Sequence, residues 1–323
     1  MELAKVAYLP GTTAPDPTTR DLRGVIRDAL ESDRDLTQAK IARESGVSPT
    51  RVSQWLAGNY AGDNESVEQM LQRWLDTRLA RREVMQTMPR APDYVATPSA
   101  ELVYRTLRFA QYAGDLSVIY GAAGVGKTAA LHYFAAQSPN VFVATMTPAS
   151  AGVVPALEEI ALSVDASSAA GGAAKLHRAI VARLRGTNGL LAIDEAQHLS
   201  VLALDQVRAI HDACGVGLAL LGNETVFARM TGGNRAATYD RLFSRIGKRV
   251  RLGQASAEDA RAMADAWGVT DPASRTLLAD IAAQPGALRT VTKVLRVAGM
   301  SAGAGAAPGI DAIRAAWSEL GGA

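Results

Sequence analysis

A glycine-rich segment followed by a lysine and a threonine is the part of the sequence best suited to chemistry. It reads "GAAGVGKT" over residues 121–128 and fits the pattern G-x-x-x-x-G-K-[ST] directly after the apolar run "LSVIY". Glycines in such a pattern let successive backbone N–H groups face phosphate oxygens, and the following helix adds its positive N-terminal end. We therefore expect a phosphate-binding loop, in which Lys127 reaches the terminal phosphates and Thr128 holds Mg²⁺. The residues expected around the nucleotide are Gly121, Ala122, Ala123, Gly124, Val125, Gly126, Lys127, Thr128 and Ala129.

Two acids follow a second apolar run, in "LLAIDEAQHL" over residues 190–199. Ligands in parallel α/β sheets bind outside the carboxyl ends of the strands, so this pair would lie beside the phosphate loop. Asp194 would support Mg²⁺ through its water shell, and Glu195 would orient and polarise the water that attacks the γ-phosphate. Either acid alone fits a solvated strand end or a helix cap; the pair downstream of a phosphate loop favours catalysis. We interpret His198 as structural.

An asparagine ends a third apolar run, "LALLGN", over residues 218–223. Asn223 is placed to sense the γ-phosphate or to hold the attacking water. An ordinary turn at the end of a strand is the competing interpretation, because asparagine is common in turns.

A basic segment, "TYDRLFSRIGKRVRL", spans residues 238–252. A solvated basic face is the plain interpretation. Phosphoryl transfer also needs positive charge on the developing negative charge, and an arginine from a neighbouring subunit can supply it. Arg245 is the first candidate for that role and Arg241 the second. Arg289, one turn into a later helix, would close onto the phosphates from a lid.

The elements that must position these residues begin at about residue 99, where apolar runs alternate with helical patterns. That alternation predicts a parallel sheet covered by helices on both faces. We expect an α/β core over 99–252 and a helical lid domain over 253–323. After the strand that leads into the phosphate loop, the predicted strands are 141–145, 189–193, 217–221 and 248–252.

A helix-turn-helix pattern, "LTQAKIARESGVSPTRVSQWLAGNY" over residues 36–60, comes before the core. Gly46 would supply the turn, and a Ser-Pro pair would start the second helix. Thr50, Arg51 and Gln54 would face outward on that helix, where such side chains reach base edges or phosphates. A small helical bundle for protein contacts is the alternative, since a folded helix-turn-helix can lose its DNA role.

Prolines and polar residues mark the boundaries of this first domain. A flexible lead is expected over 1–19, the helix-turn-helix domain over 20–88, and a linker over 89–98, which carries three prolines. The long helical pattern over 66–88 places Trp74 in the bundle core and not on a surface for base stacking.

Composition limits the other classes of function. The chain has 323 residues, of which 48% are hydrophobic and 20% charged, as in soluble globular proteins. A single cysteine, Cys214, and four histidines show no metal-ligand spacing. We find no signal peptide and no apolar run long enough to cross a bilayer, so the cytoplasm is expected. The net charge of +2 does not by itself indicate a nucleic-acid partner.

Taken together, the phosphate loop, "DEAQHL", the strand-end asparagine, "SRIGKR" and "PGALR" resemble the AAA+ ATPases. The order of motifs, the "DEAQ" form and the leading helix-turn-helix are most similar to the target-capture ATPases of DNA transposition, the phage Mu transposition protein B family. This resemblance implies an ATPase that binds DNA largely without sequence preference and oligomerises on it as a ring or filament. Such a protein delivers the DNA to a transposase, stimulates strand transfer, and is released when hydrolysis is triggered.

The resemblance also implies roles for individual residues. It assigns the phosphates to Gly124, Gly126, Lys127 and Thr128, magnesium and water to Asp194 and Glu195, and γ-phosphate sensing to Asn223 and Arg289. The first 99 residues are close to neutral, so either the helix-turn-helix or basic residues of the ATPase ring, among them Lys248 and Arg249, would make the main DNA contacts.

Two alternative functions are open. A replication initiator or helicase loader shares the superfamily, and a nucleotide-switched repressor would share the leading helix-turn-helix. A secretion-associated ATPase is disfavoured, because it would be expected to carry a membrane segment or a cell-wall-binding part and we find neither in the sequence. Binding of random-sequence duplex DNA in ATP favours target capture, whereas binding to one operator alone favours the repressor.

Overall fold

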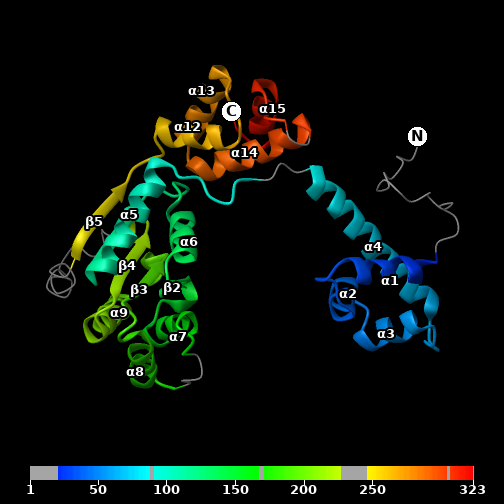
Figure 1. Ribbon diagram of the computed structural model, residues 1–323, viewed down its shortest axis with the longest axis horizontal. Helices are drawn as coiled ribbons and strands as arrows, with labels where there is room; N and C mark the ends of the chain where they lie inside the picture. Colours follow the sequence, from blue (N-terminus) through cyan, green and yellow to red (C-terminus); the bar gives the residue numbers. More distant parts are fainter. Residues whose placement is uncertain (1–20, 88–90, 167–170, 227–245, 304–305, 323) are drawn as a thin grey trace. The chain divides into compact units, whose positions relative to one another are not determined.

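The computed structural model of the chain describes residues 21–87, 91–166, 171–226, 246–303 and 306–322 (Figure 1). The chain divides between Met88 and Pro89 into two units, an N-terminal helical unit and a C-terminal α/β unit.

Four helices form the described part of the N-terminal unit: α1 Leu22–Ser32, α2 Gln38–Ser45, α3 Pro49–Ala57 and α4 Asn64–Thr87. The turn between α2 and α3 has the expected chemistry. Gly46 ends α2 with a φ of 76°, which a residue with a side chain rarely adopts. Ser48 then accepts a hydrogen bond from the N–H of Arg51 and starts α3. Ile41, Val52 and Trp55 are fully buried, so the two helices share one core.

Five parallel strands form the sheet of the C-terminal unit, in the order β2-β3-β4-β1-β5. Their bounds are β1 Leu116–Gly121, β2 Val141–Thr145, β3 Leu190–Asp194, β4 Gly217–Gly222 and β5 Ile246–Leu252. Strand β3 runs one residue further than the sequence predicts, and Asp194 is its buried last residue. The phosphate loop follows β1, which lies between β4 and β5.

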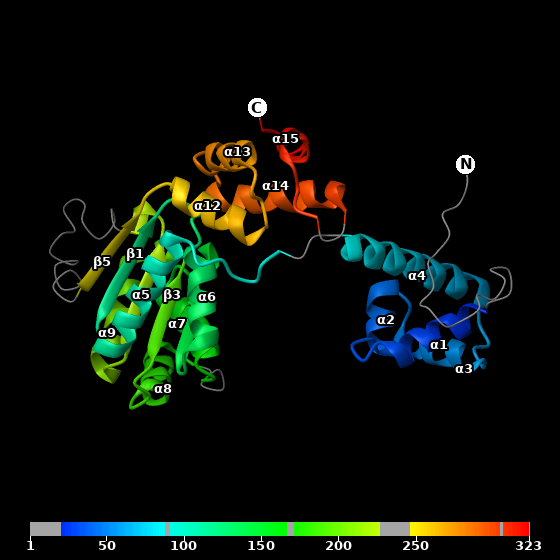
Figure 2. The same cartoon turned by 45° about the horizontal axis from the view of Figure 1, so that its top comes forward.

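Helices cover both faces of this sheet (Figure 2). They are α5 Pro98–Ala113, α6 Lys127–Gln137, α7 Val153–Ser163, α8 Ala173–Leu184 and α9 Val201–Cys214, with short 3₁₀ turns η1 Pro148–Ser150 and η2 Ala196–His198. Successive side chains of a strand point to opposite faces, so Ile119 of β1 packs with α5 and α6 while Val118 packs with α7, α8 and α9. This is the predicted parallel α/β architecture.

The C-terminal helices are α12 Ala257–Ala266, α13 Pro272–Ala282, α14 Ala287–Ala302 and α15 Ile310–Glu319. They lie together at one end of the sheet (Figure 2) and share one continuous apolar core with α5 and α6. Asp259 of α12, which is 1% exposed, accepts hydrogen bonds from the N–H and the hydroxyl of Ser99, both at 2.8 Å. This contact fixes the start of α5 against the helical region. Within the described ranges, no helix is both long and apolar enough to span a membrane.

Candidate nucleotide-binding site

The loop between β1 and α6 depends on three glycines. Gly121, Gly124 and Gly126 have φ values of 137°, 80° and 96°, which favour glycine. A Cβ at Gly121 would lie 1.9 Å from the carbonyl oxygen of Leu252, and one at Gly124 would lie 2.1 Å from that of Gly286. The loop therefore packs its backbone directly on its neighbours and ends at the N-terminus of α6, whose free N–H groups favour anions.

Lys127 is the first residue of α6, and its ammonium folds back over the loop. Its Nζ donates hydrogen bonds to the carbonyl oxygens of Gly121 at 3.0 Å and Ala122 at 2.7 Å. Burial lowers the pKa of Lys127, while the nearby carboxylates of Glu195 and Asp194 oppose that change. The ammonium thus lies among groups that compensate its charge, at the loop that would hold phosphates.

Thr128 and Asp194 meet at the base of the site. The Thr128 hydroxyl donates a hydrogen bond to Asp194 Oδ2 at 2.8 Å, and the N–H of Glu195 donates to Oδ1 at 3.0 Å. Hydroxyl and carboxylate oxygens suit Mg²⁺, which protein side chains hold through one or two groups together with phosphates and water. Among the described residues there is no group of three or more His, Cys, Asp or Glu side chains that would hold a metal alone. The donor set therefore fits Mg²⁺ bound with a nucleotide.

Glu195 leaves the strand in an unusual backbone conformation. Its φ of 53° and ψ of 38° lie in the left-handed region, where residues other than glycine are uncommon and which recurs at functional sites. Its carboxylate accepts a hydrogen bond from the side-chain amide of Gln197. Gln197 belongs to the same "DEAQ" segment as Glu195, but the motif by itself predicts no role for it.

Asn223 both forms a turn at the end of a strand and lies at the candidate site. Its Oδ1 accepts a hydrogen bond from the N–H of Thr225 at 2.9 Å, which is the turn chemistry expected at the end of a strand. Its backbone N–H donates to Oε1 of Gln197 at 3.3 Å. The residue also lines the cavity described next, so its amide nitrogen is the part of the side chain available to a ligand.

A cavity of about 460 Å³ joins these residues. Its walls come from the phosphate loop, the ends of β3 and β4, helices α12 and α14, and the segment before α5. Among its lining residues are Tyr94, Gly124, Gly126, Lys127, Thr128, Glu195, Gln197, Asn223, Met263 and Arg289. The structure thus brings Arg289 of α14 to the same cavity as the loop.

Some of the predicted nucleotide residues do not line this cavity. Val125 is fully buried in the core, Gly121 belongs to β1, and the carbonyl of Ala122 serves Lys127. The other loop residues predicted from the sequence, Ala123 to Ala129 apart from Val125, line it directly.

The segment before α5 forms a wall of the cavity that the sequence does not predict. The prolines of residues 89–98 predict a linker, yet Pro92, Tyr94 and Val95 line the cavity. The Tyr94 ring stacks on that of Tyr133 of α6, with centroids 3.8 Å apart. Its hydroxyl oxygen is buried without a hydrogen-bond partner, and burial raises the pKa of Tyr94 to about 12. A tyrosine in a Pro-rich segment after a helical domain is a weak signal in sequence alone.

The basic residues fall into two groups. Arg241 and Arg245 lie outside the described residues. Lys248 and Arg249 lie on β5, an edge strand, and do not line the cavity. The ammonium of Lys248 lies 5.7 Å from the centroid of the Phe109 ring, a distance compatible with a cation–π contact.

The helix-turn-helix unit presents the three predicted outward residues. Thr50, Arg51 and Gln54 are all exposed on α3. The pattern therefore predicts correctly which face of α3 is buried and which faces solvent.

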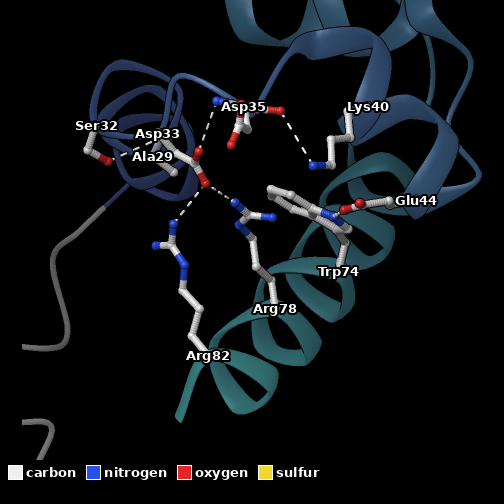
Figure 3. A network of polar contacts seen from close by, with 9 residues as sticks. All are labelled: Ala29, Ser32, Asp33, Asp35, Lys40, Glu44, Trp74, Arg78 and Arg82. Atoms are coloured by element: carbon white, nitrogen blue, oxygen red, sulfur yellow. Dashed lines mark hydrogen bonds and ion pairs between the residues drawn. The ribbon is translucent and has the colours of Figure 1, made fainter. Parts of the chain in front are cut away.

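Arginines gather on another face of the same unit. Asp33 accepts hydrogen bonds from Arg78 and Arg82 of α4, and Glu44 accepts one from Trp74 at 2.9 Å (Figure 3). The backbone N–H of Asp35 and these two arginines hold the pKa of Asp33 below its usual value. A groove of about 500 Å³ beside this network is lined by Glu44, Ser45, Met70, Arg73, Trp74, Thr77, Arg78 and Arg81. Three arginines of α4 thus line one groove together with Glu44, although α4 as a whole carries as many acidic as basic residues.

Comparison with known proteins gives two family matches. Residues 244–320 match the family described as "Mu B transposition protein, C terminal", and residues 111–230 match an AAA domain family. The chain is 39% identical over 301 residues to the ATP-dependent target DNA activator B of Escherichia phage Mu, covering 93% of this chain and 95% of that protein. It is 37% identical over 265 residues to the Mu-like prophage FluMu DNA transposition protein B of Haemophilus influenzae, covering 81% and 91%.

Among solved structures, the ORC2 protein of Aeropyrum pernix, in ADPNP–ADP complexes, superposes with a TM-score of 0.53 at 18% identity. The match covers 70% of this chain and 69% of that one. At this identity the likeness concerns the fold.

Proposed function

Because the chain belongs to the family of Mu B transposition proteins, we propose that it is an ATPase that binds target DNA when loaded with ATP and delivers that DNA to a transposase. Hydrolysis of ATP then releases it from DNA. The observation that carries the proposal is the cavity where the phosphate loop, Glu195, Asn223 and Arg289 meet. Relatives named as ATP-dependent target DNA activators support the same activity.

The residues around this cavity have separate roles in the proposed reaction. Lys127 exchanges its contacts with the loop carbonyls for contacts with β- and γ-phosphate oxygens, because a charged donor prefers an anionic acceptor. Thr128 and Asp194 would hold Mg²⁺, which supplies positive charge to the phosphates when it is bound. Glu195 orients the attacking water and accepts its proton, and Asn223 and Arg289 contact the γ-phosphate.

Hydrolysis is proposed to depend on a neighbouring subunit and on DNA. Arg245, or Arg241 as the second candidate, would reach the nucleotide of the adjacent copy in a homo-oligomer assembled on DNA, where its charge stabilises the transition state. DNA would bind through Thr50, Arg51 and Gln54 of the helix-turn-helix unit and through Lys248 and Arg249 of β5, mainly at phosphates. The exposure of Thr50, Arg51 and Gln54 on α3 supports a DNA role for the N-terminal unit. The site of action is the cytoplasm.

The test compares ATP hydrolysis and DNA binding with random-sequence duplex DNA, with and without ATP. The expected result is ATP-dependent binding without sequence preference and faster hydrolysis in the presence of DNA. Lys127→Ala should lose both, because the lost contact is to the nucleotide and the apolar core is unchanged. Lys175→Ala, an exposed lysine of α8 outside the cavity, is the matched control.

The contrary outcomes are specific. DNA binding and nucleotide affinity that persist unchanged in folded Lys127→Ala would contradict the proposed nucleotide site. Binding restricted to one operator sequence would instead indicate a nucleotide-switched repressor.

A further inference from the structure

Gln197 connects the carboxylate of Glu195 with the end of β4. Its amide nitrogen donates a hydrogen bond to Glu195 Oε2, and its amide oxygen accepts one from the backbone N–H of Asn223 at 3.3 Å. All three residues line the same cavity. We infer that Gln197 is a positioning residue for ATP hydrolysis, which fixes the carboxylate of Glu195 relative to the β4 end where Asn223 faces the γ-phosphate.

The backbone on the Glu195 side of this bridge is fixed independently of Gln197. Asp194 is 2% exposed, its carbonyl accepts a hydrogen bond from the N–H of Met146 at 2.9 Å, and the carbonyl of Glu195 accepts one from the N–H of His198 at 3.0 Å. The left-handed conformation of Glu195 lies between these two contacts. What remains free is the Glu195 side chain, with three rotatable bonds between backbone and carboxylate. A hydrogen bond to one carboxylate oxygen restricts them, and the other oxygen stays available for water.

The β4 side of the bridge is fixed by close packing. A Cβ on Gly222 would lie 2.4 Å from Oε1 of Gln197 and 2.4 Å from Cγ2 of Val226. The amide of Gln197 therefore rests directly on the backbone of Gly222, one residue before Asn223. Glycine is required here for close approach, because any side chain would displace the amide or Val226.

Only an amide of this length satisfies both ends. The site needs a donor toward Glu195 and an acceptor toward the N–H of Asn223, and glutamine supplies both from one group. A glutamate at 197 would set two carboxylates against each other, and an alanine would remove both contacts. Because a general base must be held at hydrogen-bond distance from its water, loss of the bridge should affect the rate of the chemical step.

This inference rests on the proposed hydrolytic role of Glu195, so the experiment is a double-mutant cycle on the full chain. Turnover at saturating ATP and Mg²⁺ with random-sequence duplex DNA is measured for wild type, Gln197→Ala, Glu195→Gln and the double variant. Nucleotide affinity and thermal midpoints are measured alongside. Gln206→Ala is the matched control, since Gln206 contacts His177 and does not line the cavity.

The expected result is a kcat lowered roughly ten- to a hundredfold in Gln197→Ala, which is less than the full contribution of a general base because Glu195 itself remains. Affinity for ATP should stay within about twofold of wild type, because the chemical step is affected and binding is not. In the Glu195→Gln background the same change should have no further effect, because Gln197 acts through that carboxylate.

Three results would overturn the inference. The first is an unchanged kcat in Gln197→Ala, and the second is a raised kcat, which would mean that Gln197 restrains Glu195. The third is an equal loss of kcat when Gln197→Ala is made in wild type and in Glu195→Gln. The proposed function fails separately, through wild-type turnover in Glu195→Gln alone.

Discussion

The hydroxyl of Thr128 donates a hydrogen bond to the carboxylate of Asp194 at 2.8 Å, across 66 positions of sequence. It joins the first turn of α6 to the last residue of β3. The phosphate loop and the end of β3 are therefore linked directly by a side-chain hydrogen bond.

Removal of this hydroxyl should selectively weaken the binding of Mg²⁺ and so raise the Mg²⁺ concentration that hydrolysis requires. Thr128→Val has nearly the same shape but no oxygen, so half-maximal hydrolysis should need about ten- to a hundredfold more Mg²⁺. Thr128→Ser keeps the hydroxyl and should behave as wild type. A Mg²⁺ titration of ATP hydrolysis measures both, and equal Mg²⁺ requirements in the two variants would refute the assignment of Thr128.

The helix-turn-helix should contact DNA mainly through phosphates. Arg51→Ala should weaken binding evenly across sequences and reduce the slope of log affinity against log salt by about one, because one phosphate contact is lost. Binding is measured at several salt concentrations on duplexes of unrelated sequence, with Arg178→Ala of α8 as the exposed-arginine control. Loss on a single sequence would favour the repressor, and no loss would favour a protein-contact role.

Mixing two inactive variants tests whether an arginine acts between subunits. Arg245→Ala keeps its own phosphate loop, and Lys127→Ala keeps its arginine, so a mixture should recover part of the turnover that neither variant has alone. The rate of phosphate release is followed as the ratio of the two variants changes, with DNA present. If the mixture co-assembles and stays inactive, Arg245 acts within its own chain or not at all, and Arg241 is tested next.

Asp259 should make the stability of the α/β unit sensitive to acid. Burial tends to raise the pKa of Asp259, but hydrogen bonds from Ser99 and Ser256 outweigh it and hold the pKa below its usual value near 3.8. The folded state thus prefers the ionised carboxylate. This contribution to stability is present above pH 3.8 and is lost as pH falls through the lowered pKa.

Asp259→Asn should therefore lower the free energy of unfolding by about 1–3 kcal/mol at pH 7. The NH₂ group of the asparagine would face hydrogen-bond donors where the carboxylate of Asp259 accepts. Thermal or denaturant unfolding of both proteins at pH 7 and at about pH 3 checks this linkage. The difference between wild type and variant should narrow at the lower pH. If the difference in free energy of unfolding is the same at both pH values, the charge of Asp259 does not contribute to stability.

The parts of the site that could be predicted are those with local signatures. The phosphate loop needs glycines, lysine and threonine at fixed spacing, and Asp194 follows its own strand, so both can be read within a few residues. Gln197 could not be assigned, because its role depends on Gly222 and Asn223 of another strand. The arginines of α4 likewise form a groove only when α2 and α4 pack together.

The helical C-terminal region shows the same limit in the fold. Its helices were predictable, yet the continuous core that they form with α5 and α6 depends on contacts such as Ser99 with Asp259, which are 160 positions apart. Spacing along the chain carries no information on such pairs.

The wall formed by Tyr94 has a mechanical consequence. Residues 91–97 carry the chain from the helix-turn-helix unit into α5, and the same segment encloses the nucleotide cavity. A nucleotide that changed the stacking of Tyr94 on Tyr133 would change how firmly residues 91–97 are held against α6. A pull on this segment that displaced Tyr94 from Tyr133 would in turn change the wall of the cavity. Under the proposed function, DNA bound by the N-terminal unit would therefore act on the ATP site without touching it.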